Sequence, residues 1–130
     1  MSRRLLILIA VINVLTGIQM FAMPEYFYET VPGVRMLGPL NIHFIRDAGL
    51  SYAAAGLLQA WGWRRSSYSW SVAGGLWPVF HALFHLQMWV ARGLPVDLVA
   101  AVNLFGIQLP AWVAFIAAWQ LHNRHGGARP

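Results

Sequence analysis

The sequence predicts an all-α integral membrane protein: a single domain over residues 1–130 that forms a four-helix bundle with both termini in the cytoplasm. Its composition is 58% hydrophobic and only 10% charged, whereas a soluble domain carries about 25% charged residues. Four apolar runs of roughly 20 residues each match the thickness of a bilayer's hydrocarbon core. Four of the nine arginines stand in two pairs at the ends of these runs, where membrane topology places them; the pairs are Arg3-Arg4 and Arg64-Arg65.

The same features exclude several other classes. A formal net charge of +5 is compatible with nucleic-acid binding, but the arginines form no basic stripe, so we predict no nucleic-acid partner. The chain has no cysteine, which excludes disulfides, thiolate metal sites and iron–sulfur clusters.

The first predicted span covers residues 5–22 and follows the basic pair Arg3 and Arg4. Its apolar run of about 18 residues is longer than the 7–15 residues usual in a signal peptide, and no small-residue cleavage site follows it. The segment 23–40 is rich in proline and glycine turn signals. Its aromatic stretch 25–29 is expected to lie at the membrane interface.

The second predicted span covers residues 40–63 and begins near Pro39, a residue that suits the first turn of a helix. Its small residues allow close approach of a neighbouring membrane helix; they are Ala48, Gly49, Ala53, Ala55 and Gly56.

Residues 70–91 form the third predicted span, in which Pro78 should cause a kink. The fourth covers residues 96–121, with Asp97 as an N-terminal cap and Pro110 as a second kink. The loops that would face one side of the membrane carry six arginines: Arg3, Arg4, Arg64, Arg65, Arg124 and Arg129. The positive-inside rule therefore places both termini in the cytoplasm.

Ionisable side chains in the second and third spans are the candidate functional residues, because such groups are expensive inside a membrane. His43 and Asp47 are four residues apart on one helix face, and so are His81 and His85. At 1.5 Å per residue, Asp47 and His85 lie at the same depth. We therefore expect one buried His/Asp cluster in the outer half of the bundle.

This cluster suits a metal or a haem. The candidate metal ligands are His43, Asp47, His81, His85 and Met88. Imidazole with a thioether favours copper, whereas imidazole with a carboxylate favours zinc or iron. For a haem, the best pair of axial ligands is His43 with His85, although their depths in the membrane differ by about one helical turn. Asn41 and Arg46 would then orient the ligands from outside the coordination sphere.

Other interpretations stay open. The polar cluster could be a structural ion pair within a non-catalytic accessory subunit of a larger membrane complex, or within a homo-oligomer. It could also line a site for a quinone or a lipid. No catalytic residue is identified, and we do not expect an enzyme.

One string of residues resembles a family. Asn41-x-His43-Phe44-x-Arg46-Asp47, preceded by Pro32-Gly33 and followed by His81-x-x-x-His85, is similar to uncharacterised small bacterial membrane proteins with a loosely DoxX-like architecture. The resemblance implies a multi-pass protein of the bacterial inner (cytoplasmic) membrane. It implies no activity, cofactor or partner.

Overall fold

The computed structural model describes the backbone of residues 2–126 and the side chains of residues 3–120. Every element in this part of the chain is helical, which confirms the all-α prediction. In order they are α1 (Ser2–Ala22), α2 (Pro24–Thr30), the 3-10 turn η1 (Val34–Leu37), α3 (Ile42–Arg65), α4 (Tyr68–Ala91), α5 (Leu98–Val102), the π-helical segment η2 (Asn103–Gln108) and α6 (Leu109–Gly126).

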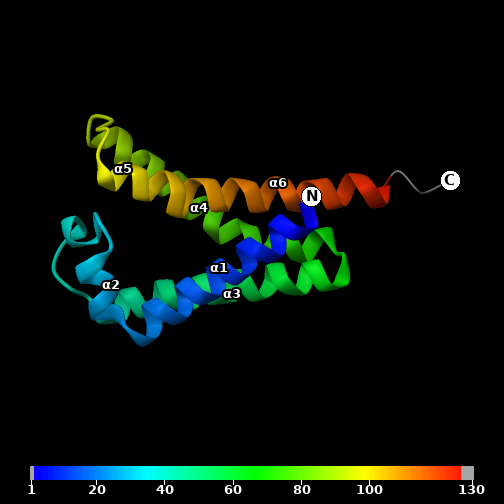
Figure 1. The fold of residues 1–130 in the computed structure, drawn as a ribbon, viewed down its shortest axis with the longest axis horizontal. Coiled ribbons are helices and arrows are strands. Elements are labelled where there is room, and N and C mark those ends of the chain that lie inside the picture. The colour runs from blue at the N-terminus through cyan, green and yellow to red at the C-terminus, as the bar shows by residue number, and fades with distance from the viewer. Residues whose placement is uncertain (1, 127–130) are drawn as a thin grey trace.

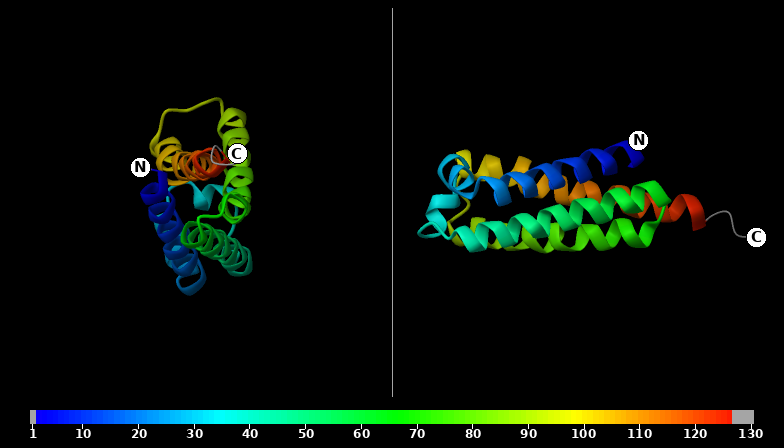
Figure 2. Two further views of the ribbon diagram at one scale, coloured as in Figure 1. Left: turned by 90° about the vertical axis from the view of Figure 1, so that its right-hand side faces the viewer. Right: turned by 90° about the horizontal axis from the view of Figure 1, so that it is seen from below.

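The four long helices pack as a ring. α1 lies between α3 and α6, and α4 lies between the same two neighbours on the other side (Figures 1 and 2). The start of α1, the α3–α4 turn and the far end of α6 lie at one end of the molecule, which we call the terminal end (Figure 1). α2, η1 and residues 92–97 lie at the opposite end, the loop end (Figure 1). A hydrogen bond of 2.9 Å from Arg3 Nη2 to the Trp63 carbonyl joins α1 to α3 at the terminal end.

Two helix starts follow from capping. The Asn41 Oδ1 atom accepts the Phe44 amide N–H at 3.0 Å, so α3 begins at Ile42. Pro39 therefore precedes the helix, and its expected place in the first turn is wrong. At α5 the Asp97 Oδ1 atom accepts the Ala100 N–H at 2.8 Å, which confirms Asp97 as a cap.

The expected irregularity at Pro110 takes the form of a π-helical segment, Asn103–Gln108, directly before it. Proline has no N–H to donate and its ring crowds the carbonyl one turn back, and a wider turn relieves that contact. Gln108 lies in this segment. Its Nε2 atom donates to the Ala82 carbonyl at 2.7 Å, which links the segment to α4.

Glycines allow α3 to approach both of its neighbours. A Cβ atom at Gly17 of α1 would lie 2.5 Å from the Gly49 carbonyl oxygen of α3. On the other side, a Cβ atom at Gly74 of α4 would lie 2.7 Å from the Ala55 carbonyl oxygen. Both distances are too short for a real side chain, so the backbones touch only because these residues have none. The small residues predicted on α3 do form its packing surface.

The molecule is apolar on its outside. Its buried core is small and consists largely of alanines; the larger members are Leu6, Ile9, Met20 and Ile45. Large apolar side chains on all four long helices are exposed instead; examples are Leu15, Leu57, Phe80 and Ile116. A soluble protein rarely exposes contiguous apolar surface on this scale, so this surface is suited to a membrane.

Within the described residues, two helical stretches are by themselves long and apolar enough to cross a membrane: Arg3–Ala22 and Leu98–Gln120. Only 33% and 17% of these windows are buried, unlike the core helix of a soluble protein. By length and apolar composition, therefore, only two of the four predicted spans qualify among the described residues. α3 and α4 fall short because α3 carries ionisable residues and α4 carries His81, His85 and Gln87.

Two neighbouring glycines of α4 provide a matched test of this packing. Gly74→Ala should lower the free energy of unfolding by about 1–3 kcal/mol, because the new methyl group meets α3 backbone. Gly75→Ala should be neutral or slightly stabilising, since its nearest neighbours would lie 4.0 Å away. Thermal unfolding in detergent measures both. Equal losses from the two variants would contradict the close α3–α4 approach.

Candidate functional site

The most concentrated polar and aromatic cluster lies between α3 and α4. It consists of Tyr52 from α3 and Trp77, His81 and His85 from α4, and we call it the histidine face. The Trp77 and His81 rings are stacked, with centroids 4.8 Å apart. The Tyr52 ring meets the Trp77 ring edge-on at 4.7 Å and the His81 ring at 5.7 Å. The two imidazole centroids are 4.5 Å apart.

The polar atoms of the histidine face have no hydrogen-bond partner in the part of the chain that the structure describes. Among residues 3–120, the imidazoles of His81 and His85 make ring contacts but no hydrogen bond, and the Tyr52 hydroxyl also makes none. All three side chains are only partly buried. An imidazole offers one donor and one acceptor when neutral, so this face presents unused hydrogen-bonding groups at its surface.

His43 and Asp47 lie elsewhere. The His43 Nε2 atom is 3.6 Å from Asp47 Oδ2, but the two side chains are 87% and 59% exposed. Tyr52, which contacts His81, is five residues beyond Asp47, or about 7.5 Å further along α3 and more than a third of a turn around it. The predicted single buried cluster is therefore wrong. In the described part of the chain, no three His, Asp or Glu side chains converge on a possible metal position.

The residues expected to orient the ligands have other partners. Arg46 donates from Nε to the Phe21 carbonyl at 3.2 Å and lies over the Phe21 ring, so it fixes the start of α3 to the end of α1. Asn41 is occupied as the cap of α3. The roles of Arg46 and Asn41 beside a bound metal remain predictions. Met88 is partly buried, three residues beyond His85, and its role as a ligand remains a prediction.

A buried amide pair crosses the α1–α3 contact. The Asn13 Nδ2 atom donates to Gln59 Oε1 at 3.0 Å, and Gln59 is completely buried. The Gln59 Nε2 atom has no partner among the described residues. The pair links α1 to α3 inside the bundle, and Gln59 was not among the candidate residues predicted from the sequence. Gln59 follows Gly56 by three residues and so lies on the small-residue face of α3. That spacing could have predicted that its side chain is buried at a helix contact.

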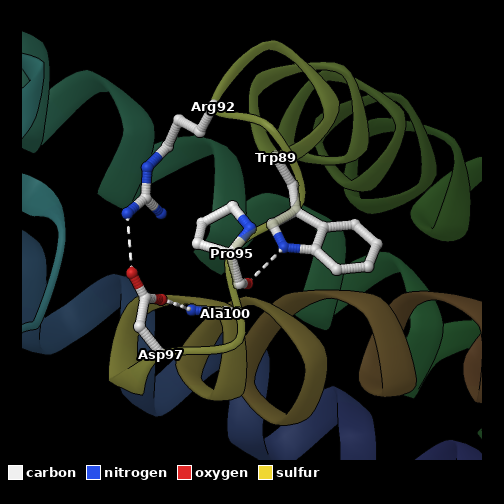
Figure 3. A network of polar contacts seen from close by, with 5 residues as sticks. All are labelled: Trp89, Arg92, Pro95, Asp97 and Ala100. Carbon is white, nitrogen blue, oxygen red and sulfur yellow. Dashed lines mark hydrogen bonds and ion pairs between the residues drawn. The ribbon is translucent and has the colours of Figure 1, made fainter.

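The loop end is held by a separate polar network (Figure 3). The Arg92 Nη2 atom lies 2.7 Å from Asp97 Oδ2, and the Trp89 indole donates to the Pro95 carbonyl at 2.9 Å. The hydrogen bond that Asp97 accepts from the Ala100 N–H, together with the one from the Arg92 guanidinium, holds the pKa of Asp97 below its ordinary value. This carboxylate is therefore ionised at neutral pH. These contacts close the α4–α5 connection and show no ligand-binding geometry.

Charge is divided between the two ends of the molecule. All four acidic side chains of the sequence lie at or near the loop end: Glu25, Glu29, Asp47 and Asp97. Arg3, Arg4, Arg64 and Arg65 lie at the terminal end, which has no Asp or Glu among its residues. The molecule therefore has a strongly basic end and an end of mixed charge.

No family model matches the chain, and no similar curated protein or solved structure was found. The resemblance to small bacterial membrane proteins therefore remains a prediction, and any function must be argued from the geometry above.

Proposed function

We propose that the chain is a multi-pass protein of the bacterial inner membrane, with four spans and both termini in the cytoplasm. α3 and α4 are as long as the two clearly apolar stretches and pack between them. Their polar groups are compatible with spanning, since most lie near helix ends or at helix contacts. The basic terminal end supports the orientation through the positive-inside rule.

Within that membrane, the protein acts as a non-catalytic accessory subunit whose histidine face binds another membrane chain. The observation that supports this is the set of unpaired polar atoms on Tyr52, His81 and His85. Ionisable groups inside a span rarely face lipid, and they normally pair with other groups or line a water-filled cavity. Because residues 3–120 supply no such partner, a neighbouring helix with polar side chains would satisfy them.

The surroundings of the two histidines suit a helix–helix contact. Phe80 and Phe84 flank them and are 67% and 54% exposed. Aromatic side chains of this kind contribute large contact areas at protein interfaces. A partner helix that packs on the phenylalanines would also cover the imidazoles.

Site-specific photo-crosslinking in native membranes tests this function. A photoreactive amino acid at Phe84, whose ring lies 6.1 Å from that of His85, should yield one discrete adduct with another membrane chain. The same group at Leu15 of α1, which is 60% exposed, is the matched control and should yield mainly lipid adducts. His81→Leu combined with His85→Leu should weaken the Phe84 adduct. Lipid adducts alone at both positions would contradict the proposal.

A transition metal bound by His81 and His85 is the second candidate function. Two imidazoles four residues apart on one helix face, with centroids 4.5 Å apart and no hydrogen bond within the described residues, are suitably placed to share one ion. Two imidazoles suit copper, zinc or iron, with the remaining positions filled from outside the chain or by Met88. His43 and Asp47 are exposed and are not part of this two-histidine site.

Metal analysis of the purified protein after loading with copper or zinc tests the second candidate. His81→Ala and His85→Ala should each lose the bound ion. His43→Ala should retain it, because His43 is exposed and distant from the histidine face. If His43→Ala loses as much metal as His85→Ala, or if the wild type binds none, the two-histidine site does not exist.

A further inference from the structure

A second surface lies at the terminal end, on the outside of α1 and α3. It is an open groove of about 310 Å³ lined by Ile7 of α1 and by Leu57, Ala60, Trp61, Trp63 and Arg64 of α3. Apart from the Arg64 guanidinium, its side chains are apolar or aromatic. Leu57 and Trp61 are 62% and 44% exposed, so the groove faces outward, where lipid would be.

The groove runs from a basic rim into the apolar zone. Arg64 lies at the end of α3, and Leu57 is seven residues earlier, or about 10 Å deeper into the bilayer. The two tryptophans stand between them at the depth where indole rings usually meet lipid headgroups.

Arginines surround the groove, and no carboxylate among the described side chains opposes them. The Arg3 guanidinium lies 5.6 Å from the centre of the Trp63 ring, and that of Arg65 lies 4.8 Å from the centre of the Trp61 ring. Arg64 makes no hydrogen bond or ion pair with any other residue of the part that the structure describes. The nearest acidic residue along α3 is Asp47, 17 residues and about 25 Å away.

From this geometry we infer that the groove binds an anionic phospholipid of the cytoplasmic leaflet, with its phosphate on Arg64 and one acyl chain along Leu57, Ala60 and Ile7. An unpaired guanidinium is a strong partner for a phosphate group. The apolar groove beneath it matches the chain that is attached to that phosphate. This inference rests on the proposed orientation in the membrane, but it concerns a different face from the histidine face.

Native mass spectrometry of the purified full chain tests the inference by titration with dioleoyl-phosphatidylglycerol or dioleoyl-phosphatidylcholine, which share the same acyl chains. The wild type should retain one phosphatidylglycerol in preference to phosphatidylcholine. Arg64→Gln should weaken that binding about fivefold, the effect of one basic residue at a lipid surface. Ala60→Phe, which fills the groove, should also weaken it, and Arg64→Lys should restore most of the preference.

Two controls separate a specific site from general attraction. Arg4→Gln removes the same charge from the same end without lining the groove, and Ala73→Phe adds the same ring at an exposed position of α4. Both should bind phosphatidylglycerol like the wild type. Any of four results would overturn the inference. These are equal binding of the two lipids, equal losses from Arg4→Gln and Arg64→Gln, no effect of Ala60→Phe, and a dimer that excludes the lipid. Because lipid binding is measured on the isolated chain, its failure is distinct from the failure of the crosslinking test.

Discussion

The close approach of α3 to α1 on one side and to α4 on the other is the constraint on which the rest of the structure depends. In a membrane, apolar side chains gain little by leaving lipid for another helix, so association relies on tight packing and polar contacts. Glycines at Gly17, Gly49, Gly56 and Gly74 provide the packing, and the Asn13–Gln59 hydrogen bond adds a polar contact inside it. This arrangement fixes the rotation of α3, and that rotation decides which of its side chains meet α4.

The same rotation separates two sets of residues that look alike in the sequence. It turns Tyr52 towards Trp77 and His81, and it leaves His43 and Asp47 exposed near the loop end. The molecule thus has two outward features: a histidine face with unpaired polar atoms around the middle of α3 and α4, and an apolar groove with an arginine rim at the terminal end. Both lie on the surface, where they are accessible to other molecules.

The helical class, the small-residue surface of α3 and the Asp97 cap could all be predicted, because each depends on local patterns: apolar periodicity, glycine and alanine spacing, and an acidic residue before a helix. The candidate site was predicted only in part. His81 and His85 are neighbours because four residues on one helix place them so. Their partner on α3 could not be identified from depth in the bilayer alone, because depth does not define how a helix is rotated about its axis. Asp47 lies at the depth of His85, but it is on a face of α3 that does not meet α4. Tyr52 and Gln59 were missed because an aromatic ring and an amide in an apolar helix resemble ordinary core residues.

The central claim is that α3 and α4 cross the membrane although they are less apolar than α1 and the α5–α6 stretch. The absence of native cysteines allows single cysteines at two exposed positions, Ser69 in the first turn of α4 and Val96 in the loop that follows the helix. Labelling of intact cells with a membrane-impermeant maleimide tests the crossing directly. The account predicts that Val96→Cys is labelled in intact cells and that Ser69→Cys is labelled only after the membrane is opened. Labelling of both positions under the same condition would contradict it.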